Sequence, residues 1–87
     1  AGPGRSGMSV YAEDEQTALI KKILKELNIG DKAMTPKSIV WKISRAKNEL
    51  MGPEALMAAS RDFLTERLYK IYSLYQKRLR EMNAYDF

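Results

Sequence analysis

The chain has 87 residues, of which 45% are hydrophobic and 30% charged, a balance typical of one globular domain with a modest core. It contains no cysteine and no histidine, which excludes a disulfide framework, a thiolate site, and the commonest general base and zinc ligand. The net charge of +4 is a mild bias toward anionic partners, and no apolar run approaches the roughly 20 residues of a membrane span.

The N-terminal region divides into an arm and a first helix. Residues 1–7 hold three glycines and a proline, which predicts a flexible arm, left by cloning or native as a linker, before one domain over 8–87. Residues 9–11 are expected to be extended or to pack against the start of a helix over 13–27. Glu13, Asp14 and Glu15 suit a first helical turn, where the dipole favours anions, better than a metal site. Apolar residues at helical spacing predict the buried face: Leu19, Ile20, Ile23, Leu24 and Leu27.

The central helix is expected over 35–51. Thr35 is a candidate N-cap, Pro36 suits the first turn, and Gly52 with Pro53 stops the helix. One face is predicted to be buried and comprises Ile39, Ile43, Ala46 and Leu50, with Val40 on its flank. The opposite face carries cations, hydrogen-bonding groups and a large aromatic: Lys37, Trp41, Ser44, Arg45 and Asn48.

The rest of the chain predicts a short helix over 53–59 and a long one over 61–82, with Ser60 as its N-cap. The buried stripe of the long helix is expected to contain Leu64, Leu68, Ile71, Tyr72, Tyr75, Leu79 and Met82. Phe63 and Leu74 fall outside that stripe and suggest a further packing partner or a dimer. The aromatic tail at 83–87 suggests excision from a larger protein. No strand is expected, so the predicted fold class is all-α: a small helical bundle of three main helices plus one short helix.

Two stretches carry a family resemblance: ISRAKNEL at 43–50 followed by Pro53-Glu54, and YSLYQKRLREMNAYDF at 72–87. In order and spacing they resemble the UvrD/PcrA/Rep group of superfamily 1 DNA helicases. The resemblance implies the helical 1B subdomain of a bacterial ATP-driven helicase, cytoplasmic and nucleoid-associated, with ATP and magnesium used by the parent enzyme. The sequence has no GxxxxGK[ST] loop, so no cofactor is expected in this chain. Relatives usually have a small or aliphatic residue at Trp41 and often a small one at Lys42.

Two functional hypotheses follow. In the first, the central helix contacts DNA, either single-stranded or at a duplex junction: Lys37, Arg45 and Lys47 neutralise phosphates, Ser44 and Asn48 donate hydrogen bonds, and Trp41 stacks on a base or ribose. In the second, the chain docks onto the remainder of the helicase motor, or onto a second copy, through Phe63, Leu74 and Tyr85. An independent enzyme is disfavoured, because the sequence has no histidine, no cysteine and no paired carboxylates at a convincing spacing. The tyrosines at 69, 72 and 75 fit helix packing better than catalysis. Neither hypothesis involves a membrane.

Overall fold

The computed structural model describes residues 9–30, 32, 34–60 and 62–86. The predicted arm at 1–7, the predicted helix start at Arg61 and the last residue, Phe87, lie outside the described residues. In chain order the elements are β1 (Ser9–Tyr11), α1 (Glu13–Glu26), α2 (Pro36–Asn48), α3 (Pro53–Ala59), α4 (Phe63–Glu81) and β2 (Ala84–Asp86). The predicted all-α class, with three main helices and one short one, is confirmed.

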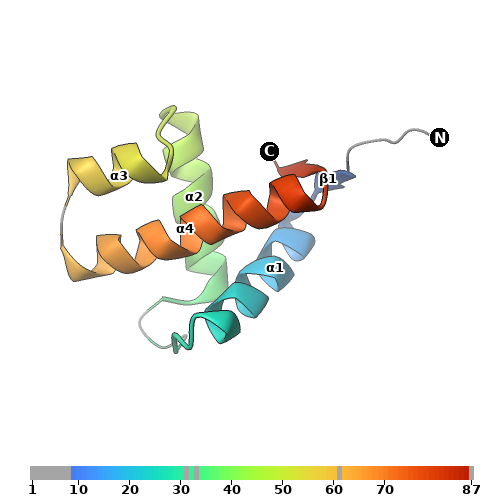
Figure 1. Ribbon diagram of the computed structural model, residues 1–87, viewed down its shortest axis with the longest axis horizontal. Coiled ribbons are helices and arrows are strands. Elements are labelled where there is room, and N and C mark those ends of the chain that lie inside the picture. Colours follow the sequence, from blue (N-terminus) through green and yellow to red (C-terminus); the bar gives the residue numbers. More distant parts are fainter. Residues whose placement is uncertain (1–8, 31, 33, 61, 87) are drawn as a thin grey trace.

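The long helix α4 packs against α1, α3 and β2, and α2 packs closely against α1. Figure 1 shows α4 crossing in front of α2 and α1, with α3 beside its N-terminal half. The apolar stripes of α1, α2 and α4 meet in one core, to which Met34 and Ala84 also contribute. The largest fully buried side chains are Ile20, Ile23, Ile39, Ile43, Ile71, Tyr72 and Tyr75. Removing these apolar surfaces from water is the main stabilisation of the fold.

The helices begin at capping residues. The Thr35 hydroxyl accepts a hydrogen bond from the Ser38 N–H at 3.2 Å, which confirms Thr35 as the N-cap of α2. The predicted cap Ser60 is wrong for α4. Ser60 is instead the C-terminal cap of α3, and the Asp62 carboxylate accepts the Thr65 N–H at 2.7 Å. That backbone hydrogen bond holds the pKa of Asp62 below its ordinary value.

The end of α2 corrects the predicted stripe. Ile39, Val40, Ile43 and Ala46 are buried as expected, but Leu50 is 94% exposed. Leu50 has a left-handed backbone with φ 58°, and the N–H of Met51 donates back to the Ala46 carbonyl at 2.8 Å. This geometry closes the helix before residue 50, turns Leu50 outward and directs Met51 toward the core.

The predicted stripes of α1 and α4 are also shorter than expected. Leu68, Ile71, Tyr72, Tyr75 and Leu79 are buried, whereas Leu64 and Met82 are exposed. Leu64 belongs to the first turn of α4, and the first turns of α4 extend past α2 (Figure 1). Met82 follows the last helical residue as the C-cap. Leu27 is only half-buried because it caps the end of α1.

The expectation of no strand is wrong in one place. β1 and β2 form a two-stranded parallel sheet in which Ser9 lies opposite Ala84, Val10 opposite Tyr85, and Tyr11 opposite Asp86. Each strand has three residues, too few for an alternating pattern to stand out in the sequence. The pairing places the first and last described segments side by side, next to the C-terminal end of α4 (Figure 1).

Candidate nucleic-acid interface

The polar face of α2 lies opposite the buried stripe. We call it the outer face of α2 and define it as Lys37, Trp41, Ser44, Arg45 and Asn48. Their spacing of four, three, one and three residues keeps them on one side of a helix. Lys37, Trp41, Arg45 and Asn48 are exposed and Ser44 is half-buried. The structure therefore brings these five predicted residues together on one surface.

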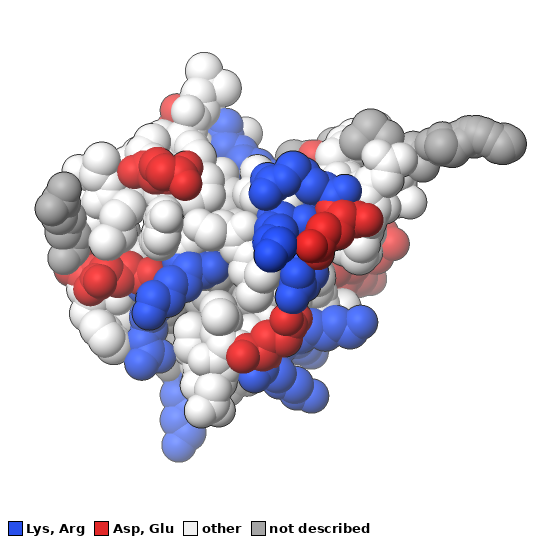
Figure 2. Space-filling view, in the orientation of Figure 1, with Lys and Arg blue, Asp and Glu red and all other residues white. Residues whose placement is uncertain are grey.

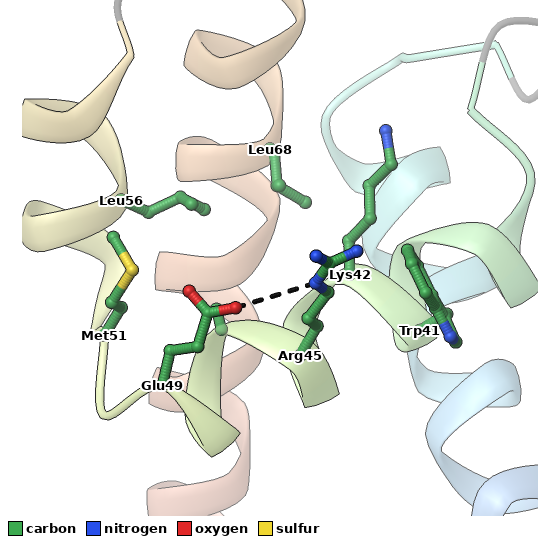
Figure 3. Close-up of a pocket in the computed structure, with 8 residues that line it drawn as sticks. Trp41, Lys42, Arg45, Glu49, Met51, Leu56 and Leu68 are labelled. Atoms are coloured by element: carbon green, nitrogen blue, oxygen red, sulfur yellow. Dashed lines mark ion pairs between the residues drawn. The ribbon is translucent and has the colours of Figure 1, made fainter.

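Trp41 and Arg45 contact each other at the middle of this face. The Arg45 guanidinium carbon lies 5.3 Å from the centroid of the Trp41 ring, and Trp41 is 59% exposed. The Arg45 Nε lies 3.6 Å from a Glu49 carboxylate oxygen one turn along the helix (Figure 3). A guanidinium has five N–H donors, so this single contact leaves others for an anionic ligand. An exposed cation–π pair of this kind is worth about 0.5–1 kcal/mol.

Lys37 stands at the other end of the face, in the first turn of α2. It lines a hollow together with Glu13, Asp14 and Lys21 of α1. These carboxylates reduce the positive potential that Lys37 presents to an anion. Asn48 is the last helical residue of α2, so its exposed side chain lies next to the turn that leads to α3.

Lys47 does not lie on the outer face. Its ammonium forms an ion pair with Asp86 of β2, and it lies 5.5 Å from the centroid of the Tyr75 ring. The Asp86 side chain is only 4% exposed, and its second oxygen accepts the Tyr75 hydroxyl at 2.6 Å. The structure thus gives Lys47 a role in holding β2 against α2 and α4.

Sequence reasoning missed this cluster of Lys47, Asp86 and Tyr75. One signal was available, because Lys47 follows Ile43 by four residues and Ala46 by one, on the flank of the buried stripe. A lysine at that position points toward the edge of a core and needs an anion there. Which acidic residue supplies the anion was not readable, because Asp86 is 39 residues away.

The predicted docking residues lie apart from one another. Phe63, in the first turn of α4, is 62% exposed and is covered on one face by the Arg67 guanidinium, 4.6 Å from its ring centroid. Leu74 is half-buried and packs against the core. Tyr85 lies in β2, which runs beside the C-terminal half of α4, and is 45% exposed. Phe63 and Tyr85 therefore lie toward opposite ends of α4.

The surface charges are mixed. Figure 2 shows Lys and Arg side chains gathered over the C-terminal half of α4, with acidic side chains beside them. Arg78 donates to Glu26 of α1 at 2.6 Å and to Glu81 at 3.0 Å. Hydrogen bonds to these two carboxylates raise the pKa of Arg78. Part of the basic surface is therefore neutralised within the molecule.

The described residues contain no group of three or more metal-ligating side chains, and none of their helices is long and apolar enough to cross a membrane. The three carboxylates of the first turn of α1 act at the helix start, where Glu15 accepts the Ala12 N–H at 3.0 Å. The printed sequence also lacks a phosphate-binding GxxxxGK[ST] loop. These residues do not fit an ATP–magnesium site.

Comparison with known proteins identifies the family. A family model described as the UvrD/REP helicase N-terminal domain matches residues 3–87. The chain belongs to this family. It is 37% identical over 79 residues to the ATP-dependent DNA helicase PcrA of Bacillus subtilis, which covers 91% of this chain and 11% of that protein. It is 33% identical over 85 residues to the ATP-dependent DNA helicase UvrD1 of Mycobacterium tuberculosis, which covers 94% of this chain and 11% of that protein.

The chain thus spans about a tenth of the length of the curated relatives it matches. No solved structure matches it with significance. The predicted relationship to UvrD-type helicases is confirmed.

Proposed function

We propose that this chain serves as a helical 1B-like subdomain of a UvrD/PcrA-type ATP-dependent DNA helicase. In this proposal the outer face of α2 contacts DNA, and the chain positions neighbouring parts of the motor during unwinding. ATP and magnesium are handled elsewhere in the helicase, because the residues of this chain do not fit them. The names of the relatives, ATP-dependent DNA helicases, support the class of enzyme and the DNA substrate.

One observation carries the DNA-contact proposal: an exposed tryptophan is held under an arginine on the polar face of a helix. Trp41 is 59% exposed, so its ring is accessible to a ligand. Nucleic acid offers Trp41 a flat base or ribose and offers Arg45 a phosphate. Base–aromatic stacking is worth roughly 1–3 kcal/mol, which exceeds the cation–π contact already present.

The electrostatic contribution is expected to be small. Lys37 and Arg45 supply two phosphate contacts at most on this face, and both have carboxylates nearby. Each phosphate contact contributes about 0.9 to the slope of log affinity against log salt concentration. The chain is therefore expected to bind DNA weakly, with a slope of about two in magnitude.

The variant Lys37→Ala/Arg45→Ala tests the proposal in a helicase that carries this chain. We expect roughly tenfold weaker DNA binding, a salt slope lower by about two, and unchanged ATP binding. The matched control is Lys70→Ala/Lys77→Ala, which removes two exposed lysines from α4. Equal losses in the two double variants would show that only net charge matters and that α2 is not the contact surface.

A second candidate function is docking onto the helicase motor without DNA contact. Its support is the exposure of Phe63 and Tyr85 at opposite ends of α4. An extended partner is needed to cover both residues at once. The single variants Phe63→Ser and Tyr85→Ser distinguish the two functions. If docking is the function, each variant is expected to weaken association with the motor and to leave DNA affinity unchanged.

A further inference from the structure

A groove opens between α2, α3 and α4 (Figure 3). Its floor consists of aliphatic side chains from all three helices and the turn before α3: Ala46, Met51, Leu56 and Leu68. Leu56 extends from α3 toward Leu68 of α4 (Figure 3). The side chains of Trp41, Lys42 and Arg45 project from α2 on the side away from α3, and Glu49 lies across from Arg45.

The helix α3, which forms one side of the groove, is only partly packed against the rest of the protein. None of the residues of α3 is buried, although the helix packs along α4. Leu56 is only half-buried and touches the core from one side. A seven-residue helix has little stability of its own and depends on tertiary packing. An occupant of the groove would bury the remaining face of Leu56 and hold α3 in place.

The chemistry of the floor favours an aliphatic occupant. Its side chains offer no hydrogen-bond donor or acceptor beyond the weak thioether of Met51. The Met51 carbonyl already accepts the Tyr72 hydroxyl at 2.9 Å. A nucleobase placed here would leave its polar edge unpaired, which is unfavourable by roughly 1–3 kcal/mol. Leucine, isoleucine or methionine side chains bring no such groups.

The rim favours a negatively charged partner. Glu49 and Arg45 form an ion pair, so their charges offset each other and Lys42 supplies the net positive charge of the rim. Lys42 makes no ion pair among the residues that the structure describes. A carboxylate that approaches along α2 therefore meets Lys42 and the unused N–H groups of Arg45.

We propose that this groove binds an acidic amphipathic peptide segment. Its aliphatic side chains occupy the floor between Leu56 and Leu68, and its carboxylates pair with Lys42 and Arg45. This is a helix-in-groove mode of recognition, in which apolar anchors provide affinity and charges provide orientation. The groove shares Trp41 and Arg45 with the outer face of α2, whereas Leu56 and Lys42 belong to the groove alone. The proposal goes beyond the DNA contact and does not depend on it.

Three synthetic peptides test the proposal with the 87-residue chain. The first has about 18 residues with leucine on one helical face and glutamate elsewhere, enough for about five turns. The second carries lysine in place of glutamate, and the third carries serine in place of leucine. Binding is followed by fluorescence polarisation of the labelled peptide and by Trp41 emission. We expect the acidic leucine peptide to bind roughly tenfold more tightly than either of the others.

The groove variants are Leu56→Gln and Lys42→Glu, with Leu50→Gln and Lys70→Glu as matched exposed controls. Circular dichroism verifies that each variant keeps its helices. We expect each groove variant to lower the affinity for the acidic peptide by roughly five- to tenfold. Each control variant is expected to lower it by less than about twofold. Lys42→Glu is expected to strengthen binding of the lysine peptide.

Several results would overturn the proposal. Equal binding of the acidic and basic peptides, or unchanged binding to Leu56→Gln, would show that the groove is not the site. Loss of single-stranded oligonucleotide binding in Leu56→Gln, with peptide binding unaffected, would assign the groove to nucleic acid. A dimer in light scattering that Leu56→Gln abolishes would make a second copy of this chain the occupant.

Discussion

Lys47 of α2 and Asp86 of β2 form an ion pair across the edge of the core, although they lie 39 residues apart in the chain. The Tyr75 hydroxyl donates to the second oxygen of the same carboxylate at 2.6 Å. One carboxylate therefore joins α2, α4 and the β1–β2 sheet. The position of the last described strand is fixed relative to the helix that carries the proposed DNA contacts.

Asp86→Asn is expected to lower the free energy of unfolding by about 2–3 kcal/mol. The amide keeps the shape of the side chain but removes the charge, so the partly buried Lys47 ammonium loses its counterion. A urea melt followed by circular dichroism measures the change. Asp14→Asn, at an exposed position in the first turn of α1, is the control. Equal midpoints for Asp86→Asn and the parent chain would mean that the ion pair contributes nothing.

Stability is expected to fall at alkaline pH because of Tyr75. Burial, followed by the hydrogen bond to Asp86, raises the pKa of Tyr75 above its ordinary value of about 10. The folded protein therefore holds the phenolic proton more tightly than the unfolded chain. This contribution is complete below about pH 10 and is lost as the pH rises above it. Burial and then the Asp86 charge raise the pKa of Tyr72 in the same direction.

The measurement is chemical denaturation between about pH 8 and pH 11, on either side of the ordinary tyrosine pKa. Tyr75→Phe carries no phenolic proton, so its stability should decline less steeply over this range. Tyr85→Phe, at a largely exposed position, should decline as the parent chain does. If the free energy of unfolding falls equally steeply with pH in Tyr75→Phe and in the parent chain, Tyr75 is not the cause of the alkaline loss of stability.

Ile43→Ala is expected to destabilise the chain by about 2–5 kcal/mol, the usual range for an isoleucine-sized cavity in a packed core. Ile43 is only 2% exposed. Leu50→Ala removes a similar side chain from a surface position and should change stability by less than about 0.5 kcal/mol. Urea melts of the two variants provide the comparison, and similar midpoints would contradict the core described above.

Leu50→Gly is expected to stabilise the chain by about 0.5–1 kcal/mol. A left-handed backbone at a residue with a Cβ is unfavourable by about 1–2 kcal/mol, and glycine removes that strain while it gives the unfolded chain more freedom. Asn28 has a similar φ of 57°, but asparagine tolerates that region, so Asn28→Gly should change less. Thermal melts test both variants. A lower melting temperature for Leu50→Gly would show that the leucine side chain contributes contacts in the fold.

Much of the fold was readable from the sequence because helical periodicity is a local signal. The spans of α1 and α3, the start of α2, the cap at Thr35 and the buried positions Ile39, Val40, Ile43 and Ala46 follow from residue type and spacing alone. The exposure of Leu50 was not readable, since the 3.6-residue period continues through it. The outward orientation of Leu50 depends on Met51, which turns back to the core. There the Met51 carbonyl accepts a hydrogen bond from the Tyr72 hydroxyl.

The pairing of β1 with β2 and the groove of α2, α3 and α4 depend on contacts between distant segments. Ser9 and Ala84 come together only after α4 has crossed the other helices. The residues of the outer face of α2, which were predicted for DNA contact, share one surface opposite the buried stripe of α2. The helical spacing of Trp41 and Arg45 predicts this arrangement. Lys47 does not, because its flank position directs it to Asp86.

Trp41 emission during titration with a tailed DNA duplex tests the central claim most directly, because Trp41 is the single tryptophan of the chain. The titration is run at low and at moderate salt, with the parent chain and with Lys37→Ala/Arg45→Ala, after circular dichroism has verified the fold. We predict a saturable change in emission that weakens as salt rises and is largely lost in the double variant. An emission spectrum that DNA does not alter at either salt concentration would contradict the assignment of the outer face of α2 as a DNA contact.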